Sequence, residues 1–269
     1  MDKMNINNSF TLITGASSGI GKAIAWYCGS KKMNLLLISL PEENLEQVAS
    51  EIQNKYGVKT HFLEIDLASK DGPLAIYNWV CEKKYDINIL VNNAGVAGTA
   101  EFEKSDPEYS DVRIMVNIRA LVLLTRYFLP LLKKNEKAYI LNVSSLSAFF
   151  SIPYKTVYSA SKAFVLNFSR SLRYELKGSP VNVSVVCPNG VRTNAGTHAR
   201  IEAHGTIARI TTVSPELLAK ITIENMLKGK FLIIPLRINR ILLLLQKIIP
   251  TETQQRILTR EFMKEVKVS

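Results

Sequence analysis

Cysteine is scarce in this sequence, and its three cysteines are far apart. Cys28, Cys81 and Cys187 have neither the even count of a disulfide framework nor the close spacing of metal ligands. We therefore expect a reduced compartment and no bound metal.

Long uninterrupted hydrophobic runs are also lacking. No apolar stretch approaches the roughly 20 residues that cross a bilayer. The start, MDKMNINNSF, is polar and has no apolar centre of the kind found in secretory signals. On these grounds we predict a cytoplasmic protein.

Acidic residues are too few to balance the basic ones. The sequence has 34 Lys and Arg against 23 Asp and Glu, a formal net charge of +11. Such a charge can attract nucleic acid, a membrane surface or an anionic ligand. The basic residues occur in short scattered clusters without the interleaved aromatics of a nucleic-acid-binding module. They are better explained as solvated helix faces, and we expect no nucleic-acid partner.

Hydrophobic residues, by contrast, make up 47% of the chain, and they alternate between two kinds of pattern. Apolar β-rich runs recur at 10–14, 34–39, 60–65, 87–91, 138–143, 181–186 and 231–234. Helical patterns lie between them at about 19–31, 41–56, 71–84, 107–133, 155–177 and 215–228. This alternation predicts an α/β fold, a doubly wound parallel sheet of about seven strands with helices on both faces.

A glycine-rich turn, TGASSGIG over residues 14–21, follows the first predicted strand and opens a helix. Glycine allows a tight turn and lets a ligand approach the backbone closely. The free N–H groups at the helix start favour a pyrophosphate. An ordinary strand–helix turn is the alternative, but this position in the fold is the one that a Rossmann-type dinucleotide site requires.

Tyr158 and Lys162 form a YxxxK motif in a helical segment. Residues four apart share a helix face, so both side chains can address one site. A free tyrosine has a pKa of about 10, and a nearby cation makes it a better acid or base at neutral pH. Taken alone, the motif is more often an exposed tyrosine with a solvated lysine.

The neighbouring motifs change that interpretation. Ser145 lies thirteen residues before Tyr158, Asn117 lies forty-one before it, and NNAG at 92–95 follows the fourth predicted strand. Together these motifs resemble the short-chain dehydrogenase/reductase family from Ser9 to about Pro235. The stretch LLLISLPEENLEQVASEIQNKYGVK also resembles the branch of 17β-hydroxysteroid dehydrogenases and long-chain 3-ketoacyl reductases.

The resemblance implies a role for each motif residue. Tyr158 would donate the proton, Ser145 would hydrogen-bond the substrate oxygen, Lys162 would hold the nicotinamide ribose and tune Tyr158, and Asn117 would anchor a proton relay. Ser144 is a competing candidate that we expect to be mainly structural. The implied dinucleotide contacts are Gly15, Ser17, Ser18, Gly19, Ile20, Gly21, Ser39, Asp66, Leu67, Asn93, Ala94, Gly95, Tyr158, Lys162, Pro188, Val191 and Thr193. In the last segment the sequence departs from the family, since Asn189 stands where glycine is usual.

The choice of dinucleotide depends on the end of the second predicted strand. Neither the aspartate typical of NAD-preferring relatives nor the arginine typical of NADP-preferring ones is present among Ser39, Leu40 and Pro41. Glu42 could bind a ribose, or it could belong to a capping box that starts at Ser39. The resembled branch mostly uses NADPH, so we favour NADP(H), with NAD(H) as the alternative.

Two segments lie outside the alternation. We expect one catalytic domain over residues 5–235, including a substrate lid at about 194–214, and a helical extension over 236–269. The lid is apolar and lacks an acidic cluster, which favours a hydrophobic, lipid-like ketone or alcohol. The extension has a basic amphipathic pattern in LRINRILLLLQKIIP, suited to packing on the protein itself, to a partner subunit or to a membrane surface. The family resemblance also implies a homodimer or homotetramer. A dinucleotide-sensing or membrane-associated protein without catalysis is the rival to an enzyme.

Overall fold

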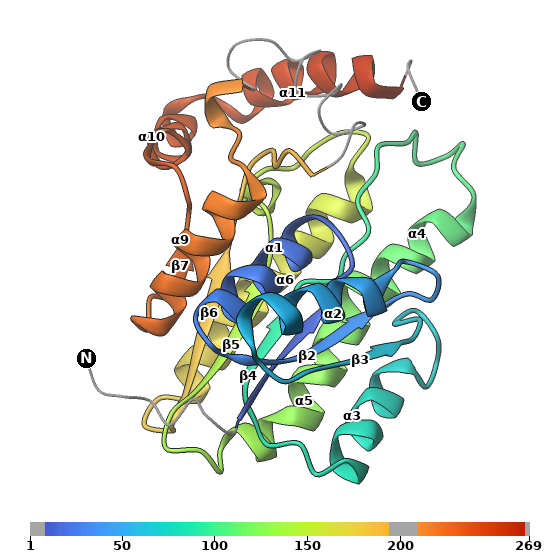
Figure 1. Cartoon of the computed structure of the whole chain (residues 1–269). Helices are drawn as coiled ribbons and strands as arrows, with labels where there is room; N and C mark the ends of the chain where they lie inside the picture. The colour runs from blue at the N-terminus through green and yellow to red at the C-terminus, as the bar shows by residue number, and fades with distance from the viewer. Residues whose placement is uncertain (1–8, 194–208, 267–269) are drawn as a thin grey trace.

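The computed structural model describes residues 9–193 and 209–266. Seven strands form one parallel sheet in the order β3-β2-β1-β4-β5-β6-β7, which confirms the predicted doubly wound architecture (Figure 1). The strands are β1 Phe10–Thr14, β2 Asn34–Ser39, β3 Thr60–Glu64, β4 Ile87–Asn92, β5 Ala138–Val143, β6 Val181–Val186 and β7 Leu232–Ile233.

Helices connect the strands and cover both faces of the sheet. Those in the first six crossovers are α1 Gly19–Ser30, α2 Leu45–Tyr56, α3 Gly72–Glu82, α4 Pro107–Ile114, α5 Leu121–Leu132, α6 Thr156–Glu175 and α9 Pro215–Leu227. Shorter helical turns are η1 Met115–Ala120, η2 Leu146–Phe149 and η3 Gln246–Ile248, and the chain ends in α10 Arg237–Leu245 and α11 Thr251–Val266.

The core has two layers, one on each face of the sheet. Strands β1, β2, β4 and β5 are buried throughout, so their side chains alternate between the layers. Helices α1, α2 and α9 pack on one face, around residues such as Ile24 and Ile52. Helices α3, α5 and α6 pack on the other, around residues such as Phe128. The sheet is therefore held rigidly, and its carboxyl edge offers a fixed platform for a site.

Helix α2 begins later than the sequence predicted. It starts at Leu45 after Asn44, which has a left-handed φ of 54°. Ser39 instead ends β2, and its hydroxyl donates to the carbonyl of Leu40. The expected capping box from Ser39 to Glu42 is therefore wrong, because the chain makes a turn at this point before the helix starts.

The helical stretch over residues 107–132 is continuous, as predicted, but it changes pitch. A π-helical turn, η1, separates α4 from α5. By length and composition this stretch is apolar enough to cross a membrane, although it holds no uninterrupted apolar run of about 20 residues. Its inward face packs on the sheet through Leu124 and Phe128, and a core helix of this kind has the same length and composition as a membrane span.

The C-terminal helices follow the last strand, and Leu243 of α10 packs in a cluster with Val185 of β6. Helix α10 follows β7, and α11 crosses above the carboxyl edge of the sheet (Figure 1). Asn239 and Leu243 are the buried residues of α10, and Asn239 donates to the carbonyl of Thr211. This leaves Ile241, Leu244 and Leu245 on the outer side, between 49% and 64% exposed.

Candidate active site

The glycine-rich turn has the shape expected of a phosphate-binding loop. Gly15 and Gly19 have positive φ angles of 65° and 54°, which glycine adopts without strain. A Cβ at Gly21 would overlap the carbonyl oxygen of Gly15, so the helix can approach the strand this closely only with glycine. Ser18 precedes α1 and makes no side-chain cap. The first N–H groups of α1 therefore remain open to an anion.

The NNAG turn after β4 supports this loop. The Thr14 hydroxyl accepts hydrogen bonds from the backbone N–H groups of Asn93 and Ala94, each at 3.0 Å. The Asn93 amide nitrogen donates to the carbonyls of Thr14 at 2.8 Å and Gly15 at 3.1 Å. Two motifs that are distant in sequence thus form one hydrogen-bonded unit.

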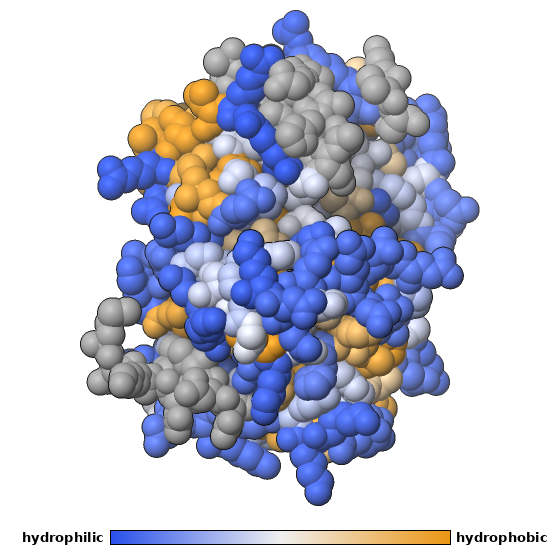
Figure 2. Space-filling view, viewed as in Figure 1, coloured by the Kyte–Doolittle hydropathy of each residue, from blue (hydrophilic) through white to orange (hydrophobic). Residues whose placement is uncertain are grey.

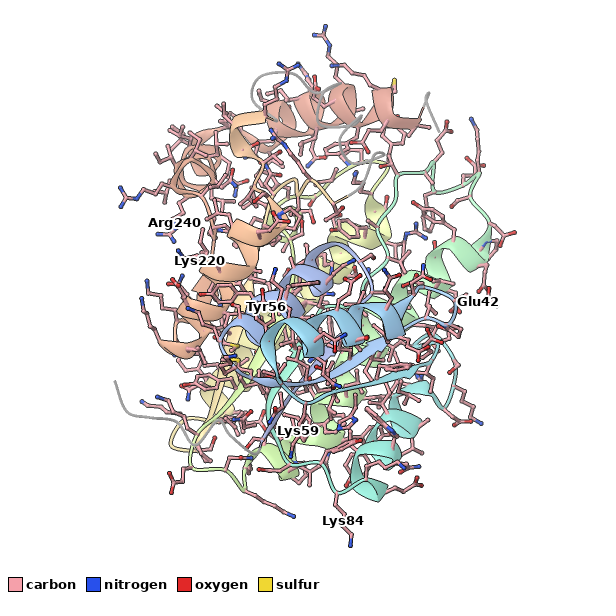
Figure 3. All side chains as sticks on the ribbon, in the orientation of Figure 1. Glu42, Tyr56, Lys59, Lys84, Lys220 and Arg240 are labelled. Carbon is pink, nitrogen blue, oxygen red and sulfur yellow. The ribbon has the colours of Figure 1, made fainter. Side chains whose placement is uncertain are left out.

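A carboxylate reaches the turn from the β2–α2 connection, but it belongs to Glu43. The Ser17 hydroxyl donates to the Glu43 carboxylate. Glu42 is exposed, has a positive φ of 63° and lies at the outer edge of the molecule (Figure 3). Sequence reasoning considered only Glu42 as the ribose-binding acid. The general rule of an acid about 20 residues after the glycine turn could have indicated either residue.

Tyr158 and Lys162 share one face of α6, as predicted. The Lys162 amine lies 5.9 Å from the centre of the Tyr158 ring and donates to the carbonyl of Val143 at 3.0 Å. Lys162 is 5% exposed, and burial lowers the pKa of its amine to about 8. Tyr158 is half-buried and faces a pocket.

Asn117 lies inside the π-helical turn and is almost fully buried. Its side-chain oxygen accepts from the backbone N–H of Val96 at 2.8 Å, and its amide nitrogen donates to the Ser161 hydroxyl at 3.1 Å. Gly95 lies next to both Asn117 and Lys162. A Cβ added to Gly95 would be 3.2 Å from Asn117 Oδ1 and 3.1 Å from Lys162 Nζ. Ser161 is a partner that the sequence analysis did not identify.

The two serines after β5 differ in their surroundings. Ser144 is buried and its hydroxyl donates to the Lys162 carbonyl at 2.7 Å, which fixes it as a structural link between β5 and α6. The Ser145 hydroxyl accepts from the backbone N–H of Ser147 at 3.1 Å. Ser145 is half-buried, and its hydroxyl proton remains available for a substrate oxygen.

The other predicted contacts follow the carboxyl ends of the strands. Leu67 is buried, and Asp66 is exposed with its carboxylate accepting from the N–H of Ala68. Pro188 accepts a backbone hydrogen bond from Leu146, while Val191 pairs with Val213. Thr193 lies next to the glycine-rich turn, because a Cβ added to Gly19 would be 3.2 Å from the Thr193 methyl group. Most of the predicted lid, residues 194–208, lies outside the described residues.

Comparisons with known proteins show the family of this chain. Residues 9–203 match the family model described as short chain dehydrogenase. The very-long-chain 3-oxoacyl-CoA reductase of Anas platyrhynchos is 37% identical over 191 residues, which cover 69% of this chain and 60% of that protein. The 17-beta-hydroxysteroid dehydrogenase type 3 of Homo sapiens is 36% identical over 189 residues, 68% of this chain and 59% of that protein. The chain thus spans about 60% of the length of these relatives.

Solved structures share the fold. A short-chain dehydrogenase from Sphingobium yanoikuyae in complex with NADPH superposes with a TM-score of 0.75 at 28% identity, covering 84% of this chain and 87% of that one. A 7beta-hydroxysteroid dehydrogenase structure superposes with a TM-score of 0.84 over 93% of this chain and 97% of that one. Its 22% identity supports the fold alone.

Proposed function

Because this chain belongs to the short-chain dehydrogenase family, we propose that it transfers a hydride between a nicotinamide dinucleotide, NADP(H) by preference, and a hydrophobic ketone or the matching alcohol. The observation that carries the proposal is the pairing of Tyr158 with a buried Lys162 on one face of α6. A related protein solved with NADPH supports the binding of NADP(H).

The proposed roles follow from the contacts of each residue. The dinucleotide, when bound, supplies or accepts the hydride. Tyr158 Oη gives a proton to the carbonyl oxygen, and Ser145 Oγ donates a second hydrogen bond to it, so the developing negative charge meets two placed donors. Lys162 carries a positive charge below its lowered pKa and stabilises the Tyr158 phenolate. Asn117 is held by Val96 and Ser161 and anchors the proton relay that leads to Lys162 and Tyr158.

The apolar substrate is inferred from two sources. The relatives named above act, by their names, on a long-chain 3-oxoacyl-CoA and on a steroid, and both classes carry large apolar bodies. Phe102, Tyr109 and Tyr154 line the pocket that contains Tyr158. Aromatic side chains of this kind line the binding sites of apolar ligands.

The decisive test is Tyr158→Phe, assayed on a panel of ketones with NADPH and NADH. We expect kcat to fall by about 10²–10⁴-fold, because general acid catalysis typically contributes this much. Binding of the dinucleotide, followed by fluorescence, should stay close to that of the wild type. A variant as active as the wild type would refute the role of Tyr158. A wild type that binds dinucleotide but reduces no ketone would favour the rival interpretation, a dinucleotide-sensing protein without catalysis.

We also propose that the protein is a cytoplasmic homodimer or homotetramer that touches an anionic membrane surface through α10. The outer side of α10 and the turn after it expose Ile241, Leu244, Leu245, Ile248 and Ile249. Figure 2 shows this apolar patch at the upper left, bordered by hydrophilic residues. Arg240 and Lys220 lie on the same flank (Figure 3).

The charge of this segment favours lipid over a second copy as the occupant of the patch. Residues 225–251 contain five basic residues and no acidic one. A symmetric contact between two copies would place like charges opposite each other. An anionic lipid surface complements both the charge and the apolar side chains.

A further inference from the structure

A buried cation lies in the wall of the pocket beside Tyr158. This pocket is formed by the loop after β4, helix α4 and the start of α6, and its lining includes Gly98, Tyr109, Arg113 and Lys155. Arg113 is only 6% exposed. Within residues 9–193 and 209–266, no carboxylate forms an ion pair with it. A guanidinium in such a place is costly unless it has an anionic partner.

The contacts of Arg113 satisfy it only in part. Its Nη2 donates to the carbonyl of Ala97 at 2.6 Å, and its Nη1 donates to the carbonyl of Tyr109. The guanidinium lies over the Tyr109 ring, 3.2 Å from its centre. In the described part of the chain, Arg113 Nε and the Tyr109 hydroxyl are buried without a hydrogen-bond partner. Two carbonyls and a ring therefore hold the cation in place but do not neutralise it.

Gly98 makes room for this pair. Its φ is +156°, and a Cβ at this position would overlap Arg113 Nη2 and the Tyr109 hydroxyl. Any larger residue would have to displace one of them. The absence of a side chain at 98 thus keeps both polar groups beside the pocket.

The second cation of the pocket is already paired. Lys155 Nζ lies 3.0 Å from the Glu265 carboxylate of α11, which also accepts from the Thr99 hydroxyl at 2.6 Å. Among the described residues that line this pocket, Arg113 is therefore the cation without a carboxylate partner. One uncompensated positive charge suits a singly charged carboxylate, whereas a doubly charged phosphate would leave excess negative charge in a buried site.

We propose that this pocket binds the carboxylate of an oxo acid, so that Arg113 and the Tyr109 hydroxyl anchor one end of the substrate while its ketone lies at Tyr158. The inference rests on the proposed ketone reduction and narrows its substrate class to apolar ketones that carry a carboxylate. A guanidinium and a phenol supply the charge-assisted hydrogen bonds that a carboxylate accepts.

The test compares straight-chain oxo acids of increasing separation between ketone and carboxylate, each beside its methyl ester. For the best acid we expect a KM about tenfold to a hundredfold below that of its ester, with kcat little changed. The ester has no carboxylate and therefore loses the charge-assisted hydrogen bonds to Arg113. Arg113→Met should abolish the difference, Arg113→Lys should restore part of it, and Tyr109→Phe should reduce it. A purely structural arginine would not alter the ratio between acid and ester.

Arg119 is the matched control. It lies one and a half turns further along the same helical stretch, and its guanidinium also donates to two backbone carbonyls, those of Ser69 and Lys70. Arg119→Met should leave the ratio unchanged. If the wild type reduces acids and esters with equal KM, the carboxylate site is refuted while the ketone reduction stands.

Calorimetry keeps the inference testable if no ketone is reduced. Decanoate should bind the wild type more tightly than decanol does, and this preference should disappear in Arg113→Met. Such a result would support the carboxylate site even though the proposed reaction had failed. Equal affinity for the two compounds would refute the site independently of the reaction.

Discussion

At the scale of single residues, burial of the charged Lys162 lowers the free energy of unfolding by an amount that depends on pH. Burial lowers the pKa of its amine from 10.5 to about 8. Between these values the unfolded chain binds more protons than the folded one, so stability increases as pH rises. We expect the free energy of unfolding of the protein without dinucleotide to gain up to about 3 kcal/mol between pH 7.5 and 10.5 from this group.

Denaturation with urea across this pH range measures the effect, and Lys162→Met isolates it. The variant should lack the rise that comes from this lysine, and it should be inactive. If the wild type and the variant change in parallel with pH, burial of the charged lysine is not the source of the dependence.

Glu43 makes a second prediction at this scale, about the choice of dinucleotide. Its carboxylate bonds Ser17 in the phosphate turn, next to where an adenosine ribose lies in Rossmann-type sites. A 2′-phosphate there would be repelled by about 1 kcal/mol at solvent-like screening. Glu43→Gln should therefore tighten NADPH about fivefold and change NADH much less. Glu42→Gln is the control, because that side chain points away, and equal effects of the two variants would contradict the assignment.

At the scale of secondary-structure elements, sequence patterns predicted most boundaries well. Every predicted strand appears within one residue of its predicted ends, because strands buried on both faces are apolar throughout and stand out between helical periods. The start of α2 was missed, since a proline and two glutamates at 41–43 suit a first helical turn as well as a loop. The π-helical turn was missed because one extra residue hardly changes an apolar period.

The glycine turn gives the prediction that belongs to this scale. Gly21→Ala would place a Cβ against the carbonyl of Gly15, a backbone atom that cannot move without opening the turn. We expect dinucleotide affinity to fall by at least about tenfold, while circular dichroism keeps the signal of a folded α/β protein. Gly57→Ala is the comparison, because it places a Cβ in open space at a positive φ of 65°. It should lower stability but leave affinity unchanged. Normal affinity in Gly21→Ala would show that the turn does not contact the ligand.

At the scale of the whole molecule, the sequence predicted the candidate site but not all of the pocket wall beside it. The motif residues Asn117, Ser145, Tyr158 and Lys162 were predicted from the family resemblance. Asn117 lies in the π-helical turn, Ser145 follows β5, and Tyr158 and Lys162 lie on α6. Arg113 was not predicted, because an arginine in a helix is usually solvated and its burial depends on Gly98, fifteen residues earlier. Likewise, an amphipathic period in 236–249 cannot tell which face packs inward. The structure places Asn239 inside and the larger apolar residues outside.

That outward face leads to a prediction for the whole molecule. The protein should co-sediment with vesicles of phosphatidylcholine and anionic phosphatidylglycerol. Less protein should co-sediment with pure phosphatidylcholine vesicles, because the contact combines apolar burial with basic charge. Leu244→Glu with Ile248→Glu should lower the bound fraction about tenfold or more. Leu74→Glu with Ile114→Glu, at exposed apolar positions on α3 and α4, is the matched control and should bind as the wild type does. If the α10 variant instead binds normally and its mass in light scattering falls from oligomer to monomer, the patch joins two copies of the chain and does not dock on lipid.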